Sequence, residues 1–378
     1  MILGIDAFNL RRGGGITHLA ELLHAADPQR HGFDEVILWG GAETLSKVDA
    51  RPWLEKVHEP MLDRSLPFRI FWHRVMERQR AREARCDIVF LPGGMASSGF
   101  SPSVTMCRNM LPFEWRELVR YGWSWVTLKL MVLRWTQAAS FRRADGLIFL
   151  TEYARKVVGE KANLKSEGSI TIPHGISPRF FHPPRKSRDK GFSWEDPCHI
   201  LYVSIISPYK HQWHVVRAVA KLRSEGVPVT LELIGPQDSG TVRLQQAINA
   251  VDPAGDFITY RGALAYEVLE QHYAAADIGV FASSCENMPN ILLEGMAAGL
   301  PMACSKMGPM PEILGDAGEY FNPLDPQDIA RSICRLVESC ELRGRHALSA
   351  FDRVKCYSWE RCSNDTFSYL SAIARKNQ

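Results

Sequence analysis

Short apolar stretches alternate with segments of helical periodicity along most of the chain, and this alternation constrains the fold more than any other feature. It is typical of a parallel sheet covered by helices on both faces, because strands buried on both sides form near-continuous apolar runs. The pattern occurs twice. The strands expected in the first half are 2–6, 35–38, 88–91, 104–106, 146–150 and 170–172. Those expected in the second half are 199–203, 230–234, 257–260, 278–281 and 301–303.

A segment of linker composition separates the two series. Residues 177–197 contain four prolines among Arg, Lys and Gly, which favours irregular structure. A chain of 378 residues also exceeds the size at which a single core stops growing. We therefore expect two doubly wound α/β domains, 1–185 and 198–355, followed by a C-terminal segment, 356–378. Ligands of such sheets bind at the carboxyl ends of the strands, so the groove between the domains is the expected site.

Composition and charge exclude several classes of protein. The nine cysteines are odd in number and have no zinc-ligand spacing, which favours a reducing, cytoplasmic setting. No apolar run approaches the roughly 20 residues that span a bilayer, and residues 1–6 are interpreted as a first strand and not as a signal peptide. Residues 64–143 contain 14 Lys and Arg against 5 Asp and Glu, a net +9, so this region is expected to form a basic surface.

The segment from Ala282 to Pro301 combines a polar loop with the start of a helix. Pro289 suits a first helical turn, and the backbone amides of Asn290, Ile291 and Leu292 would then be free to bind an anion. Glu294 is expected one turn inside the helix, where a carboxylate can accept hydrogen bonds from both hydroxyls of a ribose. Glu286 stays in the loop. Taken singly, Glu286 could equally be a solvated loop acid and Glu294 an acid stabilised by the helix dipole.

In combination these residues resemble the retaining glycosyltransferases of family 4. Glu286, Glu294, Gly299 and Pro301 occupy the places of that family's two acids, seven residues apart, and of its Gly-x-Pro turn. Further matches are Glu312, Gly318 and Pro323 downstream, and upstream the strand-Gly turns ending in Gly235 and Gly262. The resemblance implies the GT-B fold, two Rossmann-like domains facing a central cleft, with the nucleotide sugar bound by the C-terminal domain. It also implies that the helix after Tyr357-Ser358-Trp359 crosses back to the N-terminal domain.

Lys210 lies where the family places a lysine on the donor diphosphate. A cation there would stabilise the negative charge that accumulates on the departing nucleoside diphosphate. The simpler alternative is a surface lysine after a strand. Ser204 and Ile205 stand where many relatives have Gly-Arg, and His211 or Arg108 could supply the missing positive charge.

The N-terminal half offers further candidates. The glycines at 13–15 follow the first strand, and Gly14 and Gly15 match a family loop that faces the donor phosphates, although a plain tight turn would have the same sequence. Arg108 and Asn109 follow the expected strand 104–106, and Asn109 replaces a family histidine beside the transferred sugar. His174 replaces an asparagine and would lie on the acceptor side or be satisfied locally in its turn.

The resemblance therefore implies retaining transfer of a sugar from a nucleotide-diphosphate donor to a saccharide or lipid-linked saccharide. The residues that lead up to Lys210, Tyr-Val-Ser followed by Pro-Tyr-Lys, resemble those of mannosyltransferases of surface-polysaccharide assembly. This resemblance favours GDP-mannose as donor and a role in surface-polysaccharide or lipopolysaccharide assembly. No cofactor is expected, and no metal, because the chain has no Asp-x-Asp motif. The alternatives are a same-fold nucleotide-sugar epimerase or phosphorylase, and a non-catalytic nucleotide-sugar-binding module.

Residues 113–143 interleave four tryptophans with basic side chains. One interpretation is peripheral contact with the inner face of the cytoplasmic membrane; the other is an ordinary core helix with solvated arginines. Nucleic acid is not expected as a partner, because no nucleic-acid-binding motif is present and the pI is a moderate 8.3.

Overall fold

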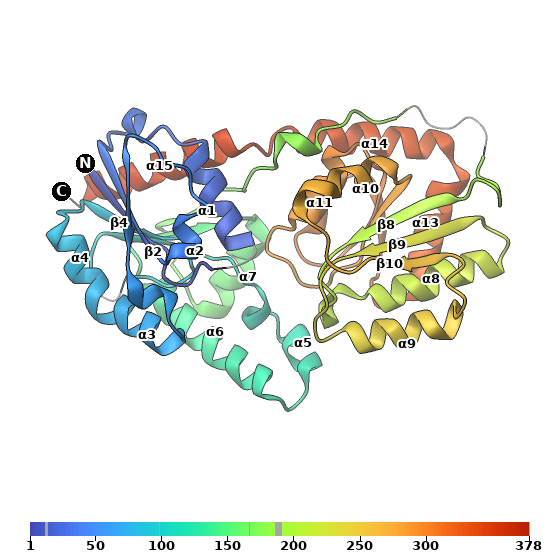
Figure 1. Cartoon of the computed structure of the whole chain (residues 1–378), viewed down its shortest axis with the longest axis horizontal. Coiled ribbons are helices and arrows are strands. Elements are labelled where there is room, and N and C mark those ends of the chain that lie inside the picture. Colours follow the sequence, from blue (N-terminus) through green and yellow to red (C-terminus); the bar gives the residue numbers. More distant parts are fainter. Residues whose placement is uncertain (12–13, 98, 166, 186–190, 378) are drawn as a thin grey trace. The chain divides into compact units, whose positions relative to one another are not determined.

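The computed structural model describes the whole chain except residues 12–13, 98, 166, 186–190 and 378. Its contacts divide the chain into two units (Figure 1). The first unit comprises Met1–Leu118, Trp123–Gly175 and the C-terminal segment from Tyr357, and the second comprises Val119–Gly122 and Ile176–Cys356. Each unit contains its own parallel sheet and its own core.

The first unit is built on a seven-stranded sheet with the order β3-β2-β1-β4-β5-β6-β7, in which all neighbouring strands are parallel. The strands are β1 (Ile2–Asp6), β2 (Glu35–Gly40), β3 (Leu54–His58), β4 (Ile88–Leu91), β5 (Ser103–Met106), β6 (Gly146–Phe149) and β7 (Ser169–Thr171). The chain first winds outwards from β1 to β3 and then returns to β4 on the other side of β1. The loops after β1 and β4 therefore lie at the switch point of this sheet, where α/β proteins bind ligands.

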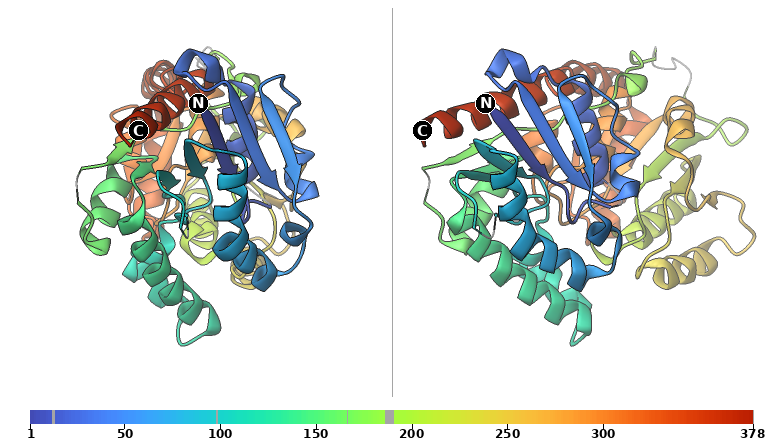
Figure 2. Two further views of the ribbon diagram at one scale, coloured as in Figure 1. Left: turned by 90° about the vertical axis from the view of Figure 1, so that its left-hand side faces the viewer. Right: turned by 60° about the vertical axis from the view of Figure 1, so that its left-hand side comes forward.

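Helices cover both faces of this sheet. They are α1 (Gly14–His24), α2 (Ala42–Leu45), α3 (Leu66–Phe71), α4 (Glu77–Glu83), α5 (Trp115–Leu118), α6 (Trp125–Arg143), α7 (Glu152–Ala162) and α15 (Trp359–Lys376). Four short 3-10 turns, η1 (Pro28–His31), η2 (Pro60–Asp63), η4 (Leu111–Phe113) and, in the second unit, η5 (Val119–Tyr121), join them. A π-helical turn, η3 (Trp72–Met76), connects α3 to α4. Because parallel crossovers are right-handed, α3, α4 and α6 lie on the face opposite α1 and α15 (Figures 1 and 2).

The second unit contains a six-stranded sheet with the order β10-β9-β8-β11-β12-β13, again parallel throughout. Its strands are β8 (Cys198–Val203), β9 (Val229–Ile234), β10 (Ile258–Tyr260), β11 (Ile278–Phe281), β12 (Met302–Ser305) and β13 (Gly318–Phe321). Here the direction of winding changes between β8 and β11. The segments that follow these two strands are therefore the switch-point segments of the second unit.

The helices of the second unit follow its strands in the usual alternation. They are α8 (Gln212–Ser224), α9 (Thr241–Val251), α10 (Leu269–Ala275), α11 (Asn290–Ala297), α12 (Met310–Leu314), α13 (Pro326–Glu338) and α14 (Cys340–Val354). Short 3-10 turns are η6 (Pro178–Phe180), η7 (Pro208–Lys210) and η8 (Tyr266–Val268). The core lies between the sheet and these helices, with Trp213, Phe281 and Phe321 among its largest fully buried side chains.

The eleven expected strands are all present, with ends shifted by at most two residues. Two further strands, β3 and β13, were not predicted. Both are edge strands. β3 has only one fully buried residue of five, Leu54, and β13 has half-buried Glu319 and Tyr320, so neither forms an apolar run in the sequence. Gly318, one of the residues that match the family, begins β13.

The predicted fold class is confirmed: two doubly wound α/β units, with the C-terminal helix returning to the first. α15 packs against α1 and contacts β4. The Tyr369 hydroxyl donates a hydrogen bond to the carbonyl of Gly168 at 2.7 Å and accepts one from the amide of Leu147 at 3.2 Å. Among the helices of the described residues, none combines the length and the apolar character needed to cross a membrane.

Candidate functional site

The predicted strand-to-helix corner is present in the second unit. β11 ends at Phe281, and α11 begins at Asn290 with Pro289 as an extended N-cap. The amides of Asn290 and Ile291 have no acceptor within the described part of the chain. The amide of Leu292, however, donates to the carbonyl of Pro289 at 3.2 Å. The prediction that Leu292 offers a free N–H is therefore wrong, because the first turn of α11 is closed by this short-range hydrogen bond.

The loop before α11 is attached to the segment that follows β8. The amide of Ser284 donates to the carbonyl of Tyr209 at 2.8 Å, and the hydroxyl of Ser284 is 2.8 Å from Nε2 of His211. Since β8 and β11 are neighbouring parallel strands, their carboxyl ends meet at one edge of the sheet. These bonds fix the two switch-point segments to each other.

Lys210 and Glu286 form an ion pair across these two segments. The Nζ of Lys210 donates to Oε1 of Glu286, and the side chains are only 6% and 14% exposed. The ammonium also lies 5.2 Å from the ring centroid of Phe281, and the hydroxyl of Tyr202 donates to the carbonyl of Lys210 at 2.6 Å. Lys210 is therefore not a surface lysine, and Glu286 is not a solvated loop acid. A phosphate bound here would share the ammonium with Glu286.

Glu294 lies one turn inside α11, as expected, but its carboxylate is buried. One oxygen accepts a hydrogen bond from the hydroxyl of Tyr273 at 2.9 Å. Burial raises the pKa of Glu294 to about 7, although hydrogen bonds from Tyr273 and Tyr266 oppose the rise. Because burial raises its pKa, this acid binds a proton more tightly than an exposed glutamate does.

Two glycine turns lie beside this corner, at the carboxyl ends of β9 and β10. Gly235 has φ 151°, and a Cβ placed on it would lie 1.9 Å from the carbonyl oxygen of Ser204, so no side chain fits. Its amide donates to the carbonyl of Gly262 at 2.8 Å. Gly262 has φ 72° but borders open space. The two turns thus support each other, and Gly235 lets β9 approach the segment after β8.

The two residues at the positions where many relatives have Gly-Arg carry no positive charge. Ser204 is buried, and its hydroxyl has no partner among the described residues, while Ile205 is 37% exposed. His211 cannot replace the arginine. Burial, together with the positive charges of Arg120, His214 and Arg243, lowers the pKa of His211 to about 3, so its ring is neutral at physiological pH. The suggestion that His211 supplies a positive charge is therefore wrong.

In the first unit, Arg108 is joined to the glycine loop after β1. Its guanidinium donates to the carbonyl of Gly14 at 2.7 Å and to that of Gly15 at 3.4 Å. Burial lowers the pKa of Arg108 to about 10, which still leaves it charged at neutral pH. α1 begins at Gly14, so Arg108 holds the start of this helix; Gly13 lies outside the described residues.

Asn109 and His174 are both engaged locally. Oδ1 of Asn109 accepts a hydrogen bond from the amide of Leu111 at 3.1 Å, the geometry of an Asx turn. His174 is 4% exposed and stacks on Trp359, with ring centroids 5.7 Å apart. His18 contacts the same pair edge-on, 5.4 Å from Trp359. His174 is therefore a packed turn residue, which was one of the two alternatives.

The structure brings the predicted residues together in two groups. In the second unit Lys210, Glu286, Asn290 and Ile291 lie at the switch point, with Glu294 one turn deeper. In the first unit Arg108 contacts Gly14 and Gly15, with Asn109 adjacent in sequence. Two residues were not singled out from the sequence.

Those two residues are Tyr273 and His18. His18 is buried, and neither ring nitrogen has a hydrogen-bond partner in the described part of the chain. A polar residue on the apolar face of α1, between Ile16 and Leu19, is a signal that could have found His18. Nothing in the local sequence distinguishes Tyr273, because its importance depends on contact with an acid 21 residues away.

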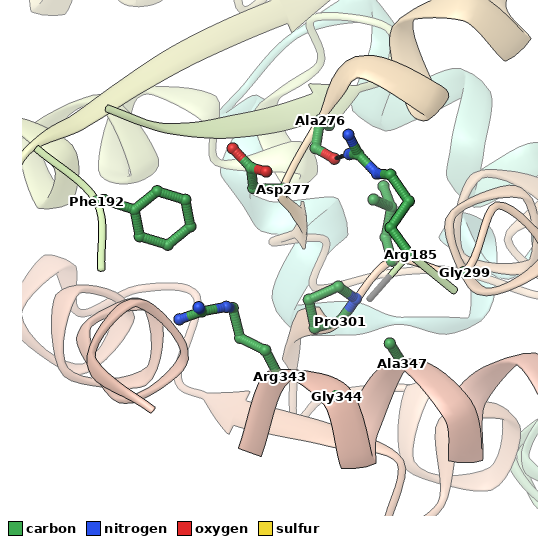
Figure 3. Close-up of a pocket in the computed structure, with 10 residues that line it drawn as sticks. Arg185, Phe192, Ala276, Asp277, Gly299, Pro301, Arg343, Gly344 and Ala347 are labelled. Atoms are coloured by element: carbon green, nitrogen blue, oxygen red, sulfur yellow. Dashed lines mark hydrogen bonds between the residues drawn. The ribbon is translucent and has the colours of Figure 1, made fainter. Parts of the chain in front are cut away.

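A small pocket of about 80 Å³ lies elsewhere in the second unit (Figure 3). It is lined by Asp277 and Pro301, which precede β11 and β12, so it lies at the amino ends of these strands, opposite the Lys210–Glu286 pair. Its guanidinium groups are occupied: Arg185 donates to the carbonyl of Ala276, and Arg343 donates to the carbonyl of Leu336. We therefore do not assign the donor to this pocket. Across the described ranges, no group of three or more His, Cys, Asp or Glu side chains could hold a metal ion.

Comparison with known proteins finds similarity to a family over part of the chain. Residues 197–339 match the family model of glycosyl transferases group 1. A GDP-mannose-dependent alpha-(1-6)-phosphatidylinositol dimannoside mannosyltransferase of Mycobacterium tuberculosis is 27% identical over 235 residues, 61% of this chain and 58% of that protein. The O-antigen chain mannosyltransferase B of Escherichia coli is 32% identical over 112 residues, 30% of this chain and 29% of that protein. The matches thus span less than two thirds of the length of these curated relatives.

Solved structures resemble the chain over nearly its full length. HepE of Anabaena, in complex with UDP and glucose, has a TM-score of 0.70 at 18% identity and covers 98% of this chain and 100% of that chain. WaaG, a glycosyltransferase involved in lipopolysaccharide biosynthesis, has a TM-score of 0.72 at 16% identity, covering 98% and 99%. At such identities the likeness concerns the fold alone. The chain therefore has the GT-B fold, and residues 197–339, which contain Lys210, Glu286 and Glu294, are similar to the glycosyl transferases group 1 family.

Proposed function

We propose that this chain is a retaining, metal-independent glycosyltransferase of family 4, which transfers a sugar from a nucleotide-diphosphate donor. The observation that carries the proposal is the buried Lys210–Glu286 ion pair at the switch point of the second unit, beside the amides of Asn290 and Ile291. A buried ion pair contributes little to stability compared with apolar packing, so its presence at a ligand-binding edge favours a functional role.

The donor diphosphate would bind between the ammonium of Lys210 and the start of α11. Two unpaired amides and the positive end of the helix dipole attract an anion there. Glu294 would accept hydrogen bonds from ribose hydroxyls in its ionised form, with Tyr273 holding the carboxylate in place. Glu286, whose second oxygen is not used by Lys210, would bind hydroxyls of the transferred sugar.

The reaction follows from these placements. The bond between the anomeric carbon and the diphosphate oxygen breaks, and its electron pair leaves with the diphosphate, where Lys210 and the helix amides stabilise the charge. The acceptor hydroxyl attacks the anomeric carbon on the same face. Its proton passes to the departing diphosphate, so that no enzyme base is required. The products are the glycoside and the nucleoside diphosphate.

For the donor we propose mannose from GDP-mannose. Support comes from the names of two relatives: the Mycobacterium tuberculosis relative is GDP-mannose-dependent, and the Escherichia coli relative is a mannosyltransferase. The same names concern a phosphatidylinositol dimannoside and an O-antigen chain, which supports a saccharide or lipid-linked saccharide as acceptor. We place the enzyme in surface-polysaccharide or lipopolysaccharide assembly, in the cytoplasm at the membrane, with residues 113–143 in contact with lipid.

A thermal-shift panel of GDP- and UDP-sugars tests the donor assignment. A donor at 100 times its dissociation constant stabilises the folded protein by about 2.7 kcal/mol, and we expect this with GDP-mannose. Stabilisation by UDP-glucose alone would contradict the choice of donor. Conversion of the donor to its epimer without any acceptor would instead identify an epimerase, and binding without transfer, hydrolysis or epimerisation would identify a binding module.

A further inference from the structure

Helix α6 exposes apolar side chains along one side. Trp125, Leu128, Val132 and Trp135 recur at spacings of three, four and three residues, which aligns them on one face, and each is at least half exposed. Leu130 and Phe141 are buried on another side of the same helix. Contiguous exposed apolar side chains on a helix mark a surface that binds a partner.

A second exposed apolar segment, α3, lies outside residues 113–143, the region for which the sequence suggested membrane contact. α3, with the sequence Leu-Pro-Phe-Arg-Ile-Phe, has no buried residue, and Phe68 and Phe71 are 44% and 51% exposed. Val75 on the adjoining turn η3 is also exposed. A helix that buries none of its apolar residues gains no hydrophobic stabilisation from them within this chain.

The two segments belong to the same side of the first unit. α3, α4 and α6 lie together on the face of the sheet opposite α1 and α15 (Figures 1 and 2). The chain between β4 and β5 links α6 to α4, because the amide of Ala96 donates to Ser140 of α6, and the hydroxyl of Ser97 donates to Glu77 of α4 at 2.8 Å. We call the exposed apolar residues of α3, η3 and residues 115–135 the apolar face. It consists of Leu66, Phe68, Ile70, Phe71, Val75, Trp115, Trp123, Trp125, Val126, Leu128, Met131, Val132 and Trp135.

Basic side chains lie in the same segments as the apolar face. The exposed side chains include Arg64 before α3, Arg74 on η3 and Lys129 on α6. Residues 64–143 as a whole carry 14 basic side chains against 5 acidic ones. Tryptophan beside Lys and Arg is the composition of segments that lie at the interface between lipid headgroups and acyl chains. A protein partner of the same shape would not require this excess of positive charge.

We propose that the apolar face docks on an anionic phospholipid surface through both α3 and α6. This proposal extends the proposed function, in that it names a partner surface for the membrane contact of residues 113–143 and adds α3 to it. Trp125 and Trp135 are about 15 Å apart along α6, so a helix lying parallel to the membrane inserts both rings at one depth. The basic side chains contact the headgroup phosphates, and this contact weakens as salt screens it.

Vesicle flotation tests the lipid surface without any donor or acceptor. The full chain is expected to float with vesicles containing phosphatidylglycerol and to stay in solution with vesicles of phosphatidylcholine alone. The triple variant Trp123→Ala, Trp125→Ala, Trp135→Ala should lower the partition coefficient at least about ten-fold. Trp194→Ala, which removes a tryptophan of the second unit that is 54% exposed, should leave it unchanged.

The contribution of α3 is tested by Phe68→Ser with Phe71→Ser. This pair is expected to lower the partition coefficient several-fold, while Leu348→Ser, at an exposed leucine of the second unit, serves as the matched control. Wild-type affinity in the Phe68/Phe71 pair would remove α3 from the docking surface. Circular dichroism of each variant separates loss of docking from loss of folding.

Other results would overturn the proposal as a whole. Equal binding to neutral and anionic vesicles would refute recognition of anionic lipid. Absence of vesicle binding, together with a dimer in sedimentation that the triple tryptophan variant abolishes, would assign the apolar face to a second copy of this chain. Because nucleotide-sugar binding by the thermal-shift panel needs no lipid, failure of docking and failure of the proposed function are observed independently.

Discussion

Lys210 and Glu286 are best tested as a pair, because removing one partner leaves the other charge buried without compensation, at a cost of about 3–5 kcal/mol. Lys210→Met combined with Glu286→Gln removes both charges and keeps both volumes. We expect this double variant to fold and to lose about 10²–10³-fold in kcat, since the departing diphosphate loses its cation. Circular dichroism and transfer of labelled sugar measure the two effects.

The matched control for this pair is the exposed ion pair of Lys221 and Glu225 at the end of α8, which belongs to the same unit and has the same residue types. Lys221→Met with Glu225→Gln should leave kcat and stability unchanged, because exposed pairs contribute under about 1 kcal/mol. Full activity in the Lys210/Glu286 variant would contradict the role proposed for the buried pair. A loss of the same size in the control would show that the assay reports stability and not chemistry.

Glu294 gives the folded protein a specific pH dependence. Its pKa is about 7 in the folded state, above the ordinary 4.5, because of burial. The folded state therefore binds this proton more tightly than the unfolded state, and stability falls as the pH rises from about 4.5 through 7. We expect the free energy of unfolding of the wild-type protein to fall by on the order of 3 kcal/mol between pH 5 and pH 8, and we expect Glu294→Gln to abolish this fall. Urea unfolding at several pH values measures it, and an identical pH slope in both proteins would contradict the assignment.

At the scale of helices and strands, the sequence predicts whatever depends on local pattern. β4, β8 and β11 are apolar runs buried on both faces, so they were predicted within a residue or two. β3 and β13 were missed because an edge strand needs little apolar surface. The helix start at Asn290 was predicted from Pro289 and the polar loop before it.

The missing parts of the site depend on contacts between residues distant in sequence. Lys210 and Glu286 were each identified, but their pairing across 76 residues could not be predicted. The same holds for His211, whose charge is lost through burial that no neighbouring residue reveals. Tyr273 becomes important only because α10 packs its hydroxyl against Glu294. The types of residue in the candidate site could be predicted from the sequence. Their protonation states and their ion-pair partners could be known only from the fold.

Gly235 and Gly262 form two turns of the same kind with different requirements. Gly235→Ala would place a methyl group 1.9 Å from the Ser204 carbonyl at φ 151°, so β9 must move away from the segment after β8. We expect a loss of at least about 3 kcal/mol. Gly262→Ala, at φ 72° in open space, should cost only about 1–2 kcal/mol. Chemical denaturation ranks the two variants, and equal costs would contradict the close approach at Gly235.

At the scale of the whole molecule, the chain leaves the first unit at Ile176 and returns to it at Tyr357. α15 completes the first unit by burying Phe367 and Leu370, and Phe367 packs edge-on against Phe33 with ring centroids 6.1 Å apart. The stability of the first unit therefore depends on a helix that the sequence of the second unit separates from the rest of the first unit. Donor binding, in contrast, is proposed for residues of the second unit.

Phe367→Ala tests whether the stability of the first unit and donor binding by the second unit are independent. Removing a fully buried phenylalanine costs about 3–5 kcal/mol, and the cost falls on the first unit, because Phe367 of α15 packs against Phe33 of that unit. In calorimetry we expect one thermal transition to move down, while the transition that GDP-mannose raises keeps its position and its ligand shift. Leu348→Ala on α14, which is 57% exposed, is the control and should move neither transition. If Phe367→Ala lowered both transitions equally, the two units would unfold as one cooperative body, and the donor-bound state would depend on α15 as directly as the first unit does.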